Sequence, residues 1–131
     1  MIVLDASVLY PFIVCLPAGT VVGRLLEEGE LLAAPHLVDA EVGHTIRSHV
    51  LRGLLSFDAG TAAIEDTRSF PIKRYPHGPM LARAFELRDN ATIYDALYLA
   101  LAEALDARLL TLDRALTRVP GVRAEVQQLV A

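Results

Sequence analysis

Residues 1–5 read MIVLD, a short run of β-branched and aliphatic side chains that ends in an acid. The same pattern returns at residues 109–113, LLTLD, and residues 31–34, LLAA, form a third short apolar run. Runs of this length with no polar face are typical of strands buried in a parallel sheet. We therefore predict three central strands, two of which end close to an aspartate.

Helical periodicity fills the segments between these runs. The predicted helices have start or stop signals such as Ser56, Thr92, Gly29 and Gly53, and they cover residues 21–28, 37–52, 57–67, 79–88 and 92–106. Residues 70–75, which contain a proline, and residues 122–126 are predicted as edge strands. This alternation indicates an α/β fold, a parallel sheet with helices on both faces. Since no linker or repeat interrupts it, we expect residues 1–131 to form one domain.

The composition excludes several classes of protein. The chain has 131 residues, 53% of them hydrophobic, and a formal net charge of −4. This hydrophobic content excludes a disordered chain, and the acidic balance argues against a protein that binds nucleic acid through overall positive charge. The single cysteine, Cys15, cannot form an internal disulfide, and its apolar surroundings favour a place in the core. No apolar run is long enough to span a membrane, so we expect a cytoplasmic protein.

Three aspartates occupy positions that the predicted fold would bring to one edge of the sheet. Asp5 and Asp113 follow apolar runs, and the carboxyl ends of parallel strands meet at the same sheet edge. Asp95 is the only charge between Ile93 and Ala102, in a helix that is apolar on nearly every face. Such a helix is buried, and an unpaired buried carboxylate is unfavourable by several kcal/mol. A cation, a basic side chain or the helix N-terminus must therefore meet the Asp95 charge.

Glu41 completes this set of acids. It lies early in the helix after the second strand, on the same helix face as Leu37, Val38 and Thr45. Taken alone, Asp5 or Asp113 could be a turn former or helix cap, Asp95 could be stabilised by its own helix, and Glu41 could be solvated. Taken together, four oxygen ligands at one sheet edge favour Mg²⁺ or Mn²⁺ over softer metals.

Other catalytic signatures are missing from the sequence. There is no glycine-rich phosphate loop and no G-x-S-x-G nucleophile motif. Glu41 and His44 make one E-x-x-H spacing, whereas di-iron helical bundles need two. The histidines show no zinc-ligand spacing, and we expect His44 and His49 to be solvated or packed helix residues.

Four segments, in order, resemble one family. MIVLDASVL (1–9), APHLVDAEV (34–42), TIYDALYLALAEAL (92–105) and LLTLDRAL (109–116) are together similar to the PIN-domain ribonucleases, specifically the VapC toxins of bacterial VapBC toxin–antitoxin pairs. The resemblance implies a Rossmann-like α/β/α sandwich with a central, mainly parallel sheet, and RNA cleavage that depends on Mg²⁺ or Mn²⁺. It also implies a cognate VapB-type antitoxin as partner, a VapC homodimer, and contact with DNA only through the antitoxin.

The resemblance also implies roles for individual residues. The four acids of the family correspond to Asp5, Glu41, Asp95 and Asp113 as catalytic and metal-binding residues. Ser7 and Thr111 resemble polar positions that brace the metal ligands. Some members carry a further acid after the fourth, where this chain has Arg114-Ala115-Leu116, so a second tightly held metal is not assured. We expect RNA hydrolysis at single-stranded or loop positions, with Arg114 and Arg118, on a shared helix face, lining the RNA path.

Two other functions remain open from the sequence. The first is a catalytically inactive PIN-fold module that binds protein or RNA; the four intact acids argue against it. The second is a receiver-like phosphoacceptor domain, which also has an aspartate after a parallel strand. Such a domain usually needs an acidic pair near the first strand and a lysine late in the chain, and the only lysine here is Lys73.

Overall fold

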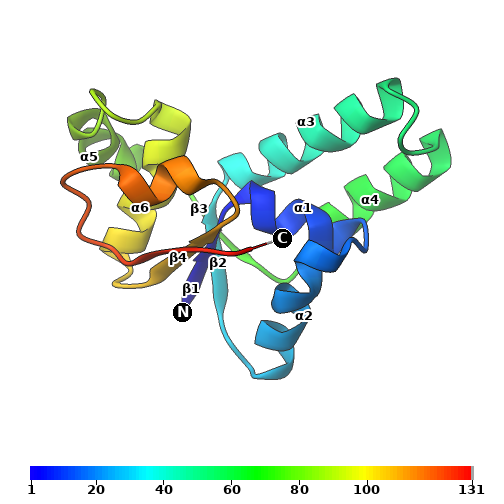
Figure 1. Ribbon diagram of the computed structural model, residues 1–131, viewed down its shortest axis with the longest axis horizontal. Helices are drawn as coiled ribbons and strands as arrows, with labels where there is room; N and C mark the ends of the chain where they lie inside the picture. Colours follow the sequence, from blue (N-terminus) through cyan, green and yellow to red (C-terminus); the bar gives the residue numbers. More distant parts are fainter. Residues whose placement is uncertain (131) are drawn as a thin grey trace.

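The fold is built on five parallel strands, seen in a computed structural model that describes residues 1–130 (Figure 1). The strands are β1 (Ile2–Leu4), β2 (Leu32–Pro35), β3 (Lys73–Tyr75), β4 (Arg108–Thr111) and β5 (Val126–Gln128), in the spatial order β3-β2-β1-β4-β5. Ile2 lies opposite Leu32 on one side and opposite Arg108 on the other. The three predicted central strands and both edge strands are confirmed, although β5 begins four residues later than expected.

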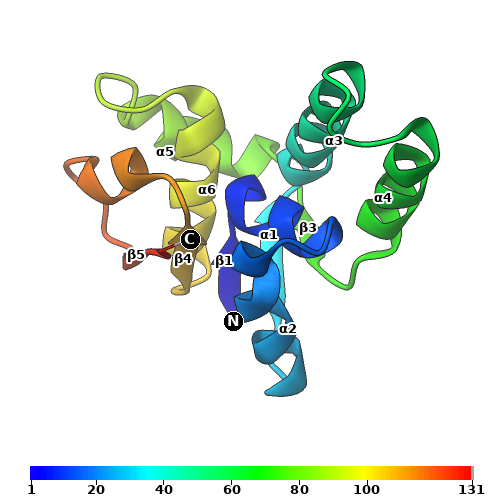
Figure 2. The same cartoon turned by 45° about the vertical axis from the view of Figure 1, so that its right-hand side comes forward.

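Helices cover both faces of this sheet (Figure 1). The helix α6 packs against β1, β2 and β4, and α5 packs on α6. On the other face lie α1 and α3 with their neighbours α2 and α4, and Figure 2 shows α3 and α4 side by side, extending away from the sheet. The helices are α1 (Ala6–Ile13), α2 (Thr20–Glu27), α3 (Leu37–Leu51), α4 (Phe57–Ser69), α5 (Leu81–Glu86) and α6 (Ile93–Ala104), with short 3-10 turns η1 (Pro17–Gly19), η2 (Gly78–Met80) and η3 (Arg114–Arg118).

The strand order explains why the helices divide in this way. Successive connections move from β1 outward to β3 and then return to β4 on the other side of β1. Because such crossovers are right-handed, reversing their direction moves the connecting helices to the opposite face. The reversal point lies between β1 and β4, and in open parallel sheets the crevice beyond the carboxyl ends of such strands is where ligands bind.

The helix α1 and the segment after it differ from the sequence prediction. The strand β1 leads directly into α1, because the side chain of Asp5 accepts a hydrogen bond from the Ser7 amide and so caps the helix. This helix was not predicted, since Pro11 lies inside it. The expectation that Cys15 lies in the core is wrong: it is exposed, just beyond the helix end, with a positive φ of 61°.

Gly19 shows how tightly the turn η1 packs on α1. A Cβ atom at this position would lie 2.2 Å from the Phe12 backbone nitrogen, so only glycine fits there.

No single helix in residues 1–130 is long and apolar enough to cross a membrane; only α1 and the η1–α2 segment, bent by 114° to each other, reach that length together.

Most of the helix α6 is buried, as its composition predicted. All residues from Ala96 to Ala102 are buried, and Tyr98 is among the largest side chains enclosed by the core. The side chain of Thr92 caps the helix by accepting a hydrogen bond from the Asp95 amide, as predicted. The buried body of α6 thus fixes its N-terminal turn, and Asp95 with it, at the carboxyl edge of the sheet.

Candidate active site

The four predicted acids line a single cavity with a volume of about 840 Å³. Asp5 comes from the junction of β1 and α1, Glu41 from α3, Asp95 from the first turn of α6, and Asp113 from the segment after β4. Elements far apart in the sequence therefore place these carboxylates at the carboxyl edge of the sheet. The cavity is lined by Asp5, Ala6, Ser7, Tyr10, Leu37, Ala40, Glu41, His44, Thr45, Tyr94, Asp95 and Asp113.

Asp5 is held in place by two hydroxyl groups. Its side chain is only 9% exposed. The Thr111 hydroxyl donates to Asp5 Oδ2 at 2.6 Å, and the Ser7 hydroxyl donates to the same oxygen at 3.0 Å. Oδ1 accepts a longer bond, 3.3 Å, from the Ser7 amide. These contacts fix the carboxylate plane and leave lone pairs of Oδ1 available for a ligand.

Ser7 and Thr111 also join the ends of β1 and β4. The Ser7 hydroxyl accepts a hydrogen bond from the Leu112 amide at 3.0 Å, and the Thr111 hydroxyl accepts one from the Asp113 amide at 2.9 Å. Thr111 is fully buried. One hydroxyl therefore contacts both the Asp5 carboxylate and the backbone of Asp113, which fixes the separation of these two acids.

Asp113 has a structural role in addition to its place in the cavity. It is exposed, and its Oδ1 accepts a hydrogen bond from the Ala115 amide at 2.9 Å, which caps η3. Oδ2 accepts no hydrogen bond within residues 1–130, and Asp113 is one of the residues that line the cavity. Asp113 can therefore cap η3 through Oδ1 and still offer Oδ2 as a metal ligand.

Glu41 is oriented by a buried tyrosine. The Tyr98 hydroxyl donates to Glu41 Oε1 at 2.7 Å, and the Tyr98 side chain is 1% exposed. Burial raises the pKa of Glu41 above its ordinary value, the Tyr98 hydrogen bond opposes this shift, and the charges of Asp5 and Asp95 add to it. As predicted, Glu41 shares its helix face with Leu37 and Thr45, which line the same cavity.

The Asp95 carboxylate experiences the same environment. Burial raises its pKa, and the negative charges of Asp5 and Asp113 raise it further. No lysine or arginine lines the cavity, and none of the four acids forms an ion pair within residues 1–130. The sequence indicates that a positive group must neutralise the Asp95 carboxylate, and within the described residues no lysine or arginine does so.

This donor set fits a hard divalent cation. Its carboxylate oxygens are the ligands that Mg²⁺ and Mn²⁺ prefer, and a cation would relieve the mutual repulsion of the acids. Across the described residues, no three acidic, histidine or cysteine side chains are yet arranged to share one ion. Glu41 Oε1 and Asp113 Oδ1 already accept hydrogen bonds from the Tyr98 hydroxyl and the Ala115 amide, so sharing one ion requires these side chains to rotate.

Arg114 and Arg118 are not arranged as the sequence suggested. They lie in η3, a 3-10 turn, whereas a shared face was expected for an α-helix. With three residues per turn, positions four apart differ by about a third of a turn. Both side chains are exposed and neither lines the cavity, so the shared-face expectation is wrong because the segment has 3-10 geometry.

Sequence reasoning missed several aromatic residues of this site. Tyr98 could have been found by asking which group receives the hydroxyl of a tyrosine inside an apolar helix, since a buried hydroxyl needs a partner. Tyr10 lines the cavity and its hydroxyl pairs with His49 Nδ1, which places His49 among packed residues. His44 and Tyr94 line the cavity as exposed rings. The sequence marks His44 only by its E-x-x-H spacing with Glu41, and no sequence signal distinguishes Tyr94.

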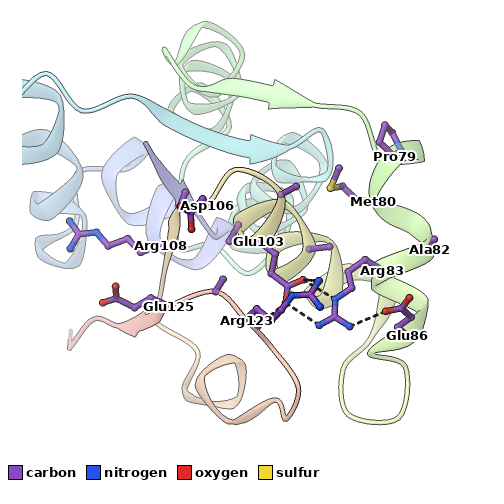
Figure 3. Close-up of a pocket in the computed structure, with 15 residues that line it drawn as sticks. Pro79, Met80, Ala82, Arg83, Glu86, Glu103, Asp106, Arg108, Arg123 and Glu125 are labelled. Carbon is purple, nitrogen blue, oxygen red and sulfur yellow. Dashed lines mark hydrogen bonds and ion pairs between the residues drawn. The ribbon is translucent and has the colours of Figure 1, made fainter.

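A second cavity, of about 690 Å³, lies at the other end of α6 (Figure 3). Its wall carries a network of paired charges: Arg83 Nε and Nη2 donate to the Glu103 carboxylate at 2.8 and 3.0 Å, and the Arg123 amide donates to it at 2.8 Å. Arg83 also pairs with Glu86. The central groups of this network, Arg83 and Glu103, are satisfied by one another, so the network joins α5, α6 and the following loop.

Comparison with known proteins gives consistent matches. The PIN domain family matches residues 2–122. Ribonuclease VapC1 of Mycobacterium tuberculosis is 41% identical over 126 residues, which cover 95% of each chain, and Ribonuclease VapC12 of the same organism is 40% identical over 127 residues, 97% of this chain and 98% of the relative. The crystal structure of VapBC2 from Rickettsia felis, bound to a DNA fragment from its promoter, superposes with a TM-score of 0.71 at 16% identity, over 99% of this chain and 100% of that chain.

Proposed function

The chain belongs to the PIN domain family and is a VapC-type ribonuclease of a toxin–antitoxin system, and from this premise we propose that it hydrolyses RNA with a divalent metal ion and thereby inhibits growth. The observation that carries the proposal is the convergence of Asp5, Glu41, Asp95 and Asp113 on one cavity that no lysine or arginine lines. An inactive interaction module would gain nothing from this arrangement, because clustered carboxylates without a cation destabilise the fold.

We assign the metal to Asp5, Asp95 and Asp113, with Glu41 completing the site. When bound, Mg²⁺ or Mn²⁺ lowers the pKa of water and neutralises negative charge on the phosphoryl group. Ser7 and Thr111 keep the Asp5 carboxylate and the Asp113 backbone in register through the hydrogen bonds described above. Asp113 Oδ2, which has no partner within the described residues, is free to turn toward the cation.

Glu41 is suited to move a proton. Its Oε1 is held by Tyr98, which leaves Oε2 to accept the proton of the attacking water, and a raised pKa makes it a better base near neutral pH. In the hydrolysis the water oxygen forms a bond to phosphorus, and the bond from phosphorus to the leaving ribose oxygen breaks. Glu41 then releases this proton to solvent, and the leaving oxygen takes one proton from solvent, so no net proton is gained or lost by the protein.

We propose RNA as substrate, a VapB-type antitoxin as inhibitor, and a homodimer as the working form. The pairing is supported by the relatives: VapBC2 of Rickettsia felis is a complex of this kind. Because the cavity is acidic, basic groups outside its lining must attract the RNA, and we propose Arg114, directly after Asp113, and Arg118 for this role. Contact with DNA is proposed only through the antitoxin.

Purified protein incubated with a labelled stem-loop RNA tests this function. Cleavage is expected with Mg²⁺ or Mn²⁺, none with EDTA, and recovery when Mn²⁺ is added back. Sequencing RNA ends after brief induced expression in a bacterial host identifies the sites cut in cells, and co-expression of the small protein encoded next to it should suppress both cleavage and growth arrest. Metal-independent cleavage, or no cleavage of any RNA, would contradict the proposal.

A further inference from the structure

Two exposed aromatic rings border the acidic cavity, one from α6 and one from α3. Tyr94, in the first turn of α6, directly precedes Asp95 and is 61% exposed. His44, on α3, follows Glu41 by one helical turn and is also exposed. Both line the cavity that contains the four acids, so each ring lies beside a proposed metal ligand.

Neither ring contributes a specific contact to the fold. Within residues 1–130, the hydrogen bonds, the aromatic pairs and the cation–π contacts involve neither Tyr94 nor His44, whereas Tyr10 and Tyr98 near the same cavity are both hydrogen-bonded. Single exposed aromatic side chains are common on protein surfaces, but these two also line the acidic cavity. The two rings are therefore free to contact a ligand in this cavity.

The charge of the cavity indicates which part of an RNA those rings contact. Its lining contains four carboxylates and no lysine or arginine, so it attracts no phosphate beyond the one that a metal ion would neutralise. A nucleobase is uncharged and has two π-faces, and stacking on an aromatic side chain does not depend on net charge. Bases within a duplex already stack on one another, so only unpaired bases can reach such rings.

We propose that Tyr94 and His44 stack on unpaired bases next to the scissile phosphate, and that this contact makes the enzyme selective for single-stranded RNA. The inference rests on the proposed ribonuclease function and adds the residues that recognise the substrate. The Tyr94 ring is the larger contributor, because its aromatic face is wider and its position beside Asp95 is set by the buried helix α6. Neither ring takes part in the bond-making step.

Binding and cleavage measurements with ring-removing variants test this inference. The binding assay uses the full chain with Asp5→Asn, so that RNA stays intact, and follows fluorescence anisotropy of a short single-stranded oligoribonucleotide in Mg²⁺. Since base stacking contributes about 1–3 kcal/mol, Tyr94→Leu should weaken this binding by roughly 5- to 150-fold, and His44→Leu by a smaller factor. Tyr94→Phe keeps the ring and should bind as the unchanged chain does.

Two controls separate stacking from other effects. Phe57→Ala removes a ring that is more exposed than Tyr94, 77% against 61%, on α4 and outside this cavity, and should leave binding unchanged. A duplex of the same sequence should bind more weakly, with an affinity that Tyr94→Leu does not alter. Equal losses for duplex and single strand, or unchanged single-strand affinity in both Leu variants, would overturn the inference.

Kinetics of the active chain distinguish this inference from the proposed function. With Asp5 intact, Tyr94→Leu should raise KM for single-stranded RNA and leave kcat within about threefold. If the unchanged chain cleaves RNA in Mg²⁺ and Tyr94→Leu has the same KM, only the stacking inference fails. If the unchanged chain cleaves no RNA, the proposed function fails, and the binding assay still decides whether the rings select unpaired bases.

Discussion

At Asp95, two effects act on one carboxylate in opposite directions. The N-terminus of α6 stabilises the charge by about 0.3–1 kcal/mol, while burial and the neighbouring acids raise its pKa. Folding therefore favours the protonated form. At neutral pH the ionised group lowers the stability of the metal-free protein, and this penalty is absent below the ordinary pKa of aspartate.

Asp95→Asn should therefore stabilise the protein in EDTA. We expect the melting temperature at pH 7 to rise by about 2 °C, and the difference to vanish as the pH falls below the ordinary pKa of aspartate, where both side chains are neutral. Thermal unfolding at several pH values checks this. Asp106→Asn, an exposed position outside the acidic cavity, is the matched control; a lower melting temperature for Asp95→Asn at pH 7 would show that the charge is compensated in the fold.

Tyr98→Phe isolates the hydrogen bond that orients Glu41. Removing the hydroxyl leaves the core filled and takes away the one interaction that lowers the Glu41 pKa. We expect single-turnover cleavage to fall about 10- to 100-fold, as for other residues that orient a ligand. If Glu41 acts as a base, the lower limb of the pH–rate profile should also move to higher pH. Tyr75→Phe is the control, and an unchanged rate and profile would exclude a positioning role for Tyr98.

Among the helices and strands, the sequence predicts those with a clear local pattern and fails for those that depend on tertiary contacts. The strands β1, β2 and β4 are short apolar runs, and α6 has both a cap and a continuous apolar surface, so local pattern was sufficient for each. The helix α1 is not predicted because Pro11 argues against a helix, although the sequence already allowed Asp5 to be a helix cap. Cys15 was misplaced because the apolar run containing it crosses the end of this helix.

The functional site likewise has a part that the sequence predicts and a part that depends on tertiary contacts. The positions of the four acids followed from strand ends and from resemblance to a family, and the structure brings all four to one cavity. The Tyr98 contact with Glu41 joins residues 57 positions apart, and the Thr111 contact with Asp5 joins residues 106 apart. No local pattern encodes such pairs. The 3-10 geometry at Arg114 also depends on the Asp113 cap and the packing of Leu116 rather than on residue spacing.

The ion-pair network of α5 and α6 gives a prediction at this scale. The Glu103 side chain is 6% exposed, and its hydrogen bonds with Arg83 lower its pKa. Its contribution to stability is therefore present above the ordinary glutamate pKa and is lost as the pH falls through the lowered value. Glu103→Gln should reduce the free energy of unfolding by about 2 kcal/mol at pH 7, and by progressively less in acid.

Chemical denaturation at pH 7 and in acid measures this difference. Glu125→Gln is the matched control, because Glu125 lines the same cavity but is exposed and unpaired in the described chain. An equal loss at both pH values would mean that packing, and not the charge of Glu103, accounts for the effect.

For the whole molecule, metal binding and folding should be coupled. One continuous core joins the sheet to helices on both faces, and we propose that residues 1–131 unfold as a single domain. Since the cation binds the folded state, Mn²⁺ at 100 times its dissociation constant should stabilise the protein by about 2.7 kcal/mol and shift one unfolding transition upward without splitting it. Calorimetry with and without Mn²⁺ measures this, and no shift would favour a PIN-fold module without metal.

The central claim is that these acids act together as a metal-dependent RNA-cutting site. Single-turnover cleavage of an end-labelled single-stranded RNA in Mg²⁺, by Asp95→Asn beside Asp106→Asn, tests it most directly. We expect Asp106→Asn to cut at the unchanged rate and Asp95→Asn, still folded, to lose at least about 100-fold, because removing a metal ligand removes stabilisation of the transition-state charge. Cleavage by Asp95→Asn at the normal rate would contradict the account.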